Sequence, residues 1–255
     1  MEKTVKVVII FYITTYVLIY GLNFLVSSSL LSIEPGPVFL VLVNSSIILF
    51  YFVLIFFLSK LFLYKPVQVV LGLRREGTFR SLLWSGAIGT PIVVLLLFGV
   101  FVIGPEEVLK FAKPGWVNSQ PYPVWLPLAA LIFWSLSGIA SFSLFQAFPY
   151  ECLSEKPKKY VLPAIMVLWA CLYNVPFLTG KWDPVDILFF GVIFTLIYHR
   201  TRNAVGLILN YVLVFEAPVL WTFWAAWGLI AFWIFLYIRV TWCFTCLVVL
   251  MYVRK

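Results

Sequence analysis

The chain has 255 residues, of which 64% are hydrophobic, 19% are aromatic and only 11% carry a charge; its mean hydropathy is +1.06. A water-soluble domain of this composition would have too little polar surface to cover itself, so the composition excludes a soluble globular protein. It indicates an all-α polytopic membrane protein. The net charge of +8 at pH 7 requires no nucleic-acid partner, because membrane topology and anionic lipid headgroups account for it.

Apolar runs of about 20 residues cross roughly 30 Å of hydrocarbon, and runs of this kind predict eight transmembrane spans. They lie near residues 7–31, 37–59, 82–104, 124–148, 161–178, 184–199, 203–216 and 219–238, of which the seventh is short. The first run continues without a small-residue cleavage site, so we interpret it as a span and not as a cleavable signal. We treat residues 1–255 as a single membrane domain.

Basic residues orient these spans. When the loops are assigned alternately to two sides, one side carries 13 basic residues: Lys3, Lys6, Lys60, Lys65, Arg74, Arg75, Arg80, Lys156, Lys158, Lys159, Arg200, Arg202 and Arg239. The other side carries Lys110, Lys113 and Lys181. Because cytoplasmic loops are enriched in lysine and arginine, we expect a cytoplasmic amino terminus, in a prokaryotic plasma membrane.

The segments outside the spans give further expectations. Residues 65–80 alternate apolar and basic side chains, which predicts an interfacial elbow on the cytoplasmic side. Residues 104–123 form the longest external loop, rich in proline and aromatic residues; an aromatic belt is expected there, with a lid or docking surface as the alternative. Residues 240–255 are too short for a separate span and read as a helical extension or an interfacial helix. Cys243 and Cys246 stack two apolar thiols on one helix face there, and we expect neither a metal nor another cofactor.

Polar residues inside the predicted spans are the candidates for function, because a polar group in hydrocarbon is costly unless it faces the bundle interior. They are Ser141, Ser143, Gln146, Asn174, Thr195, Asn210 and Glu216, with Tyr173 and Tyr211 adjacent. Small hydroxyl groups often bond their own helix backbone. The three amides and the carboxylate need partners that lipid cannot supply.

Four stretches carry a resemblance to a known family. They are LGLRREGTFRSLLWSG (71–86), FQAFPYECLSEK (145–156), LWACLYNVP (168–176) and GVIFTLIYHRTRNAVGLIL (191–209). Their order and spacing resemble the CAAX-protease and bacteriocin-processing family of intramembrane glutamate proteases, over about residues 65–216. The resemblance implies a CAAX-protease-like helical bundle.

The family's catalytic letters are absent at the matching positions. Its paired glutamates fall on Ser141 and Phe142, and its arginine falls on Gln146. Its phenylalanine and first histidine fall on Ala170 and Asn174. Its second histidine and its asparagine fall on Tyr211 and Phe215, or on Asn210 and Val214 after a one-residue slip. A general base contributes about 10²–10⁴ in rate and each oxyanion donor about 10²–10³, so the resemblance implies a proteolytically inactive relative.

The remaining titratable residues offer little to replace that set. Glu151 and Glu155 are expected to be solvated ion-pair partners of the lysines at 156, 158 and 159. Glu106 and Glu107 read as a solvated helix start. His199 is expected at an interfacial helix end, and Glu216 in a structural or snorkelling role, with a ligand or proton-linked role as its alternative.

The sequence therefore predicts a catalytically inactive, CAAX-protease-like membrane protein. We expect it to bind membrane lipids, a lipidated peptide or another membrane protein, or to serve as an accessory subunit of a membrane complex. The predicted binding residues are Ser141, Gln146, Asn174, Asn210, Tyr211 and Glu216, which should line one polar pocket. Two alternatives stay open, namely an active intramembrane protease with an unusual catalytic set and a small-molecule transporter.

Overall fold

The computed structural model describes residues 3–27, 37–110, 112–113, 122–173 and 187–253, and these parts of the chain are helical and contain no strand. The longer α-helices are α1 (Lys3–Ser27), α2 (Pro37–Leu58), α4 (Thr78–Ile88), α5 (Thr90–Ile103), α7 (Leu126–Gly138), α9 (Lys158–Tyr173), α14 (Ala217–Trp227) and α15 (Leu229–Val253). The shorter ones are α3 (Val67–Val70), α6 (Pro105–Lys110), α8 (Phe148–Cys152), α12 (Phe194–Thr201) and α13 (Val205–Asn210). Four π-helical segments are η1 (Ser59–Leu63), η2 (Ile139–Ala147), η3 (Ile187–Ile193) and η4 (Tyr211–Phe215).

Three helices in the described residues are long and apolar enough to cross a membrane, namely Thr78–Ile103, Leu126–Cys152 and Leu229–Val253. The pair Val205–Phe215 and Ala217–Trp227, bent by 50°, makes a fourth if its two halves form one span. In the most apolar stretches of the three helices, 33%, 33% and 28% of the residues are buried, so most residues of these stretches are at least partly exposed. These features support an all-α membrane protein, while the number of eight spans stays a prediction.

The chain reverses direction earlier than the sequence predicted. The expected eighth span, 219–238, is divided at Gly228, whose φ of +85° is a conformation that residues with a Cβ rarely adopt. From Leu229 the helix continues without interruption to Val253, so most of the expected tail 240–255 is the second half of one 25-residue helix. Arg239 consequently lies buried within α15 and not in a loop. The set of loop residues predicted to be cytoplasmic then holds 12 basic residues in place of 13.

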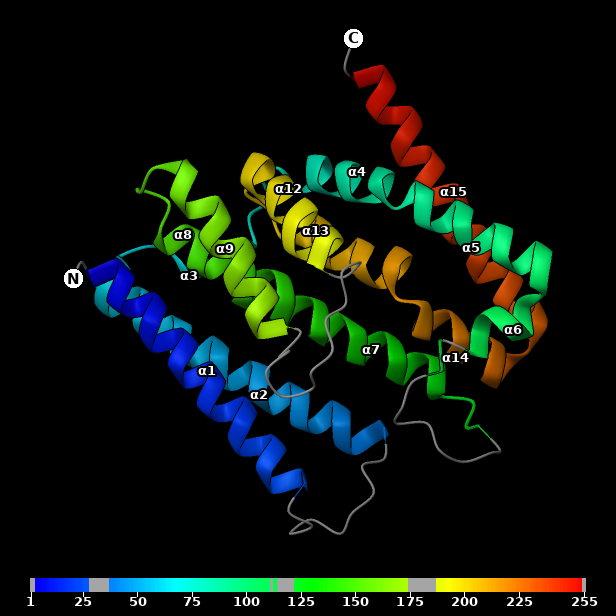
Figure 1. The fold of residues 1–255 in the computed structure, drawn as a ribbon, viewed down its shortest axis with the longest axis horizontal. Helices are drawn as coiled ribbons and strands as arrows, with labels where there is room; N and C mark the ends of the chain where they lie inside the picture. The colour runs from blue at the N-terminus through cyan, green and yellow to red at the C-terminus, as the bar shows by residue number, and fades with distance from the viewer. Residues whose placement is uncertain (1–2, 28–36, 111, 114–121, 174–186, 254–255) are drawn as a thin grey trace.

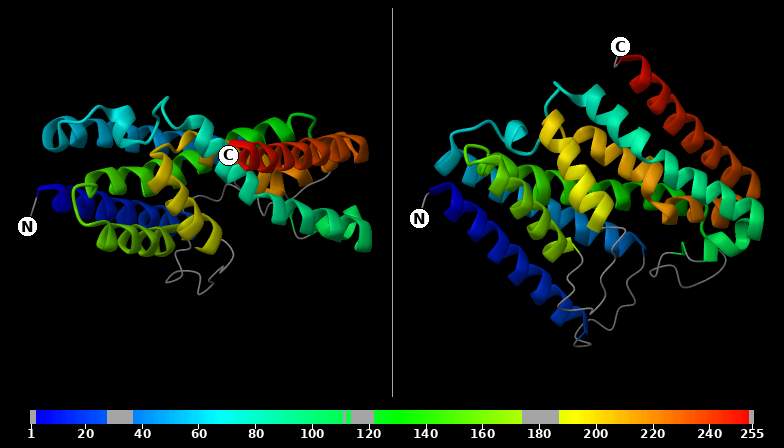
Figure 2. Two further views of the ribbon diagram at one scale, coloured as in Figure 1. Left: turned by 90° about the horizontal axis from the view of Figure 1, so that it is seen from above. Right: turned by 45° about the horizontal axis from the view of Figure 1, so that its top comes forward.

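The turns of the bundle gather at two ends. The start of α1 and the turn between α8 and α9 lie at one end of the molecule, and α6 and the turn between α14 and α15 lie at the other (Figures 1 and 2). The first end holds Lys156, Lys158 and Lys159, and the second holds Lys110 and Lys113. This arrangement agrees with the alternate assignment of loops to two sides.

The elbow at residues 65–80 packs into the body and not only against the interface. Val70 and Leu71 are buried, and Gly72 has φ +67°. A Cβ at Gly72 would lie 2.7 Å from the Tyr198 ring, so the backbone approaches α12 more closely than any other residue permits. The Ala204 N–H donates to the Gly72 carbonyl at 2.8 Å, which ties the elbow to the turn after α12.

We predict that the α8–α9 turn is cytoplasmic and that α6 is external, because lysine and arginine gather at the α8–α9 end. In a background with the four native cysteines replaced by alanine, Glu107→Cys should react with a membrane-impermeant maleimide on intact cells. Glu155→Cys should react only after permeabilisation. The reverse pattern would invert the orientation, and labelling of both from one side would refute the assignment of the two turns to opposite sides.

Candidate functional site

Several of the positions that the family resemblance assigns to catalysis lie in π-helical segments. Phe142 and Gln146 belong to η2, and Tyr211 and Phe215 belong to η4. Phe190, in η3, lies against both of these segments. Such turns are rare and occur frequently at functional sites, so this region is the first candidate in the interior.

Aromatic rings fill the space between these three segments. Phe142 is fully buried, and its ring centroid lies 5.3 Å from that of Tyr211 and 5.2 Å from that of Phe194. The Phe190 ring lies 5.2 Å from Tyr211 and 5.4 Å from Phe215. The predicted polar pocket requires open space at this position, and the rings occupy it.

The polar side chains of η2 bond to nearby groups. Ser141 donates to the Ser137 carbonyl at 2.8 Å, one turn earlier in its own helix. The Gln146 amide donates to the Phe190 carbonyl at 2.8 Å and to the Thr195 hydroxyl at 2.7 Å. These bonds fasten η2 to η3 and α12, and they leave no Gln146 donor directed toward Asn210.

Asn210 faces a different pair of helices. Its amide donates to the Leu82 carbonyl at 2.8 Å and to the Ser85 hydroxyl at 2.7 Å, both in α4. Its oxygen accepts a bond from the Trp242 indole of α15 at 2.6 Å. Asn210 and Gln146 therefore bond to separate elements and do not meet in one pocket. Asn174, the other predicted amide, lies outside the described residues.

Glu216 marks the break between η4 and α14. Its φ of −76° and ψ of 95° are extended, so the helical hydrogen-bond ladder is interrupted there. Arg239 of α15 is 1% exposed and donates from Nη2 to the Glu216 carbonyl at 2.6 Å. A carbonyl released from a helix inside hydrocarbon needs such a donor. Glu216 itself is 9% exposed, so a snorkelling role does not describe its position.

The prediction that Glu151 is a solvated partner of the neighbouring lysines is wrong. Glu151 is 4% exposed, and its carboxylate accepts bonds from Arg74 at 2.9 Å, Arg202 at 3.0 Å and the Tyr198 hydroxyl at 3.0 Å. These donors come from the elbow and from the end of α12. Glu155, by contrast, is exposed as expected. A buried carboxylate needs close partners, and arginines distant in sequence satisfy it better than mobile neighbouring lysines.

Asn203 extends this network. Its side-chain amide donates to the Arg74 and Glu76 carbonyls and to the Thr78 hydroxyl, and its oxygen accepts the Val205 N–H at 2.9 Å. Nearby, His199 lies partly exposed at the end of α12, with its Nδ1 bonded to the Tyr150 hydroxyl. The stretches LGLR and YHRTRN contribute to the family resemblance. In the structure their residues form a junction that joins the elbow, α8 and the end of α12.

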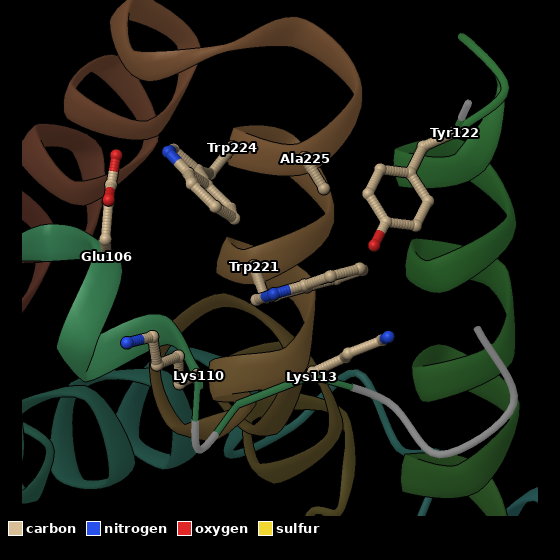
Figure 3. A pocket seen from close by; sticks show the side chains of 7 residues that line it. All are labelled: Glu106, Lys110, Lys113, Tyr122, Trp221, Trp224 and Ala225. Atoms are coloured by element: carbon tan, nitrogen blue, oxygen red, sulfur yellow. The ribbon is translucent and has the colours of Figure 1, made fainter. Parts of the chain in front are cut away.

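A cavity of about 600 Å³ lies at the opposite end of the molecule. It is lined by residues of α6 and α14, by Lys113 after α6 and by Tyr122 before α7, namely Glu106, Lys110, Lys113, Tyr122, Trp221, Trp224 and Ala225 (Figure 3). Glu106 and Glu107 occupy the exposed first turn of α6, which confirms the predicted helix start. Sequence reasoning expected an aromatic belt here and did not predict a cavity with two lysines.

The cysteines and the acidic residues form no metal site in the described part of the chain. Cys152, Cys243 and Cys246 are free and buried, and no group of three or more histidine, cysteine, aspartate or glutamate side chains could hold an ion there. Cys243 packs with Val93 and Val214, and Cys246 packs with Leu83 and Ala87. Both thiols serve as small apolar groups in helix packing.

No family model, curated protein or solved structure matches this chain. The resemblance to the CAAX-protease family therefore rests on the four stretches quoted above and stays a prediction.

We predict that Glu151→Gln lowers the free energy of unfolding by about 2 kcal/mol, because it leaves two arginines without their counter-charge. This loss is smaller than the ~3–5 kcal/mol of a fully buried pair, since the Arg74 and Arg202 side chains are 28% and 30% exposed. Denaturation in detergent would measure it. Glu155→Gln removes the same charge at an exposed position and should change stability by less than about 0.5 kcal/mol. Equal effects of the two variants on the free energy of unfolding would contradict the stabilising role of the Glu151 carboxylate at the junction.

We also predict that Asn210 and Trp242 are energetically coupled. Asn210→Leu should cost about 1–2 kcal/mol for its lost interhelical bonds, and a double-mutant cycle with Trp242→Phe should give a coupling of about 0.5–1.5 kcal/mol. Asn210→Leu combined with Thr195→Val should be additive, because the hydrogen bonds of Asn210 go to Leu82, Ser85 and Trp242, whereas those of Thr195 go to Gln146 and Gly191. Additivity in the first cycle would show that the bond contributes nothing to stability.

Proposed function

We propose that this chain is a catalytically inactive, CAAX-protease-like membrane protein whose work is to bind a lipid, a lipidated peptide or a membrane-protein partner. The observation that supports the absence of catalysis is the burial of Phe142 among the rings of Phe194 and Tyr211, at the position of a family glutamate. A hydrolase needs a base and an activated water there. Phe142 supplies no base, and aromatic rings pack against it. Binding is supported by the cavity of about 600 Å³, which lies apart from these rings.

Glu151 and Glu216, the two buried glutamates among the described residues, occupy structural positions. Glu151 is held by two arginines and a tyrosine hydroxyl, and Glu216 lies at a helix break beside Arg239. A general base must be within hydrogen-bond reach of the water that it activates, at a site that a substrate can enter. Neither carboxylate lines the 600 Å³ cavity described above.

We propose that the protein lies in a prokaryotic plasma membrane with its amino terminus in the cytoplasm.

One observation favours a second candidate, small-molecule transport. Transporters often bind substrate at broken helices near the middle of the membrane. The helix pair that is bent by 50° at Glu216 is a broken helix of this kind, and the buried Arg239 beside it is a charged group that a substrate could contact. The bond from Arg239 to the Glu216 carbonyl also explains the pair as a stabiliser of the break, so we rank transport second.

We predict that the purified protein does not cleave prenylated or unmodified peptides above the level of its Glu216→Gln variant, because Ser141 and Phe142, at the positions of the family's paired glutamates, supply no base. Mass spectrometry of peptides incubated with the protein in lipid nanodiscs would measure cleavage, and Glu151→Gln provides a second reference. Cleavage that survives purification and disappears in Glu216→Gln would establish the active-protease alternative. Solute-dependent currents in proteoliposomes that Arg239→Gln abolishes would establish the transport alternative.

A further inference from the structure

The cavity at the α6 end combines an apolar wall with positive charge. Trp221 is 3% exposed and meets the Tyr122 ring edge-on, with centroids 5.2 Å apart, so this part of the wall is fixed by packing. Trp224 adds a second indole. Rings held in this way present a large surface at low entropic cost, as in the interfacial aromatic belts of membrane proteins.

The charges of the lining favour an anion. Two ammonium groups, from Lys110 and Lys113, outnumber the one carboxylate of Glu106. Lys110 also pairs with Glu107, but their side chains are 66% and 53% exposed, and such pairs contribute little and exchange readily. In Figure 3, Lys113 and Tyr122 lie on one side of the Trp221 ring, whereas Lys110 and Glu106 lie on the other. An anionic group can thus meet a lysine on either side of the ring.

The surroundings supply a place for acyl chains. Phe101, Val102 and Ile103 at the end of α5 are 77%, 61% and 54% exposed. Leu229 and Ile230, which follow the turn after α14, are 48% and 77% exposed. These apolar residues lie at the ends of helices that are long and apolar enough to cross a membrane. We therefore expect them to contact lipid, and we expect the cavity at these helix ends to lie near headgroup depth. A volume of about 600 Å³ is within the range of sites for small ligands.

We propose that this cavity binds the phosphate headgroup of an anionic phospholipid. Lys110 and Lys113 attract the headgroup, Trp221 and Trp224 contact its glycerol region, and the acyl chains leave along the exposed ends of α5 and α15. This assignment rests on the proposed binding function and narrows it to one ligand class at one site. It lies away from the former catalytic positions, which the rings of η2, η3 and η4 fill.

The test compares retention of phosphatidylglycerol and phosphatidylcholine by the purified full chain, measured by native mass spectrometry. The double variant Lys110→Gln/Lys113→Gln should bind phosphatidylglycerol about 10- to 30-fold more weakly, at roughly a factor of five per lysine, while phosphatidylcholine is unaffected. Lys158→Gln/Lys159→Gln removes the same charge from exposed positions at the other end and should retain the lipid. Lys110→Arg/Lys113→Arg keeps the charge and should also retain it, which separates loss of charge from loss of fold.

Several results would overturn the assignment. One is phosphatidylglycerol retention by Lys110→Gln/Lys113→Gln equal to that of the unaltered chain, which would place the lipid elsewhere and leave the binding function standing. Equal retention of the two lipids would remove the selectivity for an anion. Displacement of the lipid by millimolar inorganic phosphate would assign the cavity to a free anion. Peptide cleavage in the assay above would refute the proposed function itself, whatever the lipid result.

Discussion

The buried carboxylate of Glu151 is the contact on which the packing of the basic end depends. It accepts bonds from the elbow through Arg74 and from the end of α12 through Arg202 and Tyr198. Three segments that are far apart in sequence, namely α8, the elbow and the end of α12, are thereby held together at one point. The close backbone contact at Gly72, which the missing Cβ permits, lies beside this junction and brings the elbow against Tyr198. Burial of an ion pair stabilises little by itself, but it fixes which segments meet.

This junction also explains why a sequence can resemble a protease and lack its chemistry. Several residues of the stretches that resemble the family build the junction, and they position the helices independently of any reaction. Phe142, Tyr211 and Phe215, three of the positions that the resemblance assigns to catalysis, pack instead with other aromatic rings, and their burial stabilises the interior. A resemblance in these stretches therefore requires no catalytic site.

The sequence predicted the helical class and the extent of the clearest spans, because long apolar runs leave few alternatives. The expected spans 82–104 and 124–148 correspond to Thr78–Ile103 and Leu126–Cys152. It missed the reversal at Gly228, since a single glycine barely interrupts an apolar run. It also identified polar residues such as Gln146 and Asn210 without their directions, which depend on tertiary partners 32 to 128 positions away. The sequence indicates the wrong partners for Glu151, because it shows the neighbouring lysines but not which distant residues the fold brings close. The actual partners Arg74 and Arg202 lie 77 and 51 positions away.

The position of Arg239 has a consequence for how the protein is made. An arginine near the middle of a hydrophobic helix opposes membrane insertion by about 2.5–3.5 kcal/mol, and in the finished bundle the Glu216 carbonyl helps to offset that cost. Synthesis proceeds from the amino terminus, so the segment with Glu216 enters the membrane before α15. The final helix therefore inserts into a bilayer that already contains its acceptor, and the order of the two segments along the chain favours their assembly.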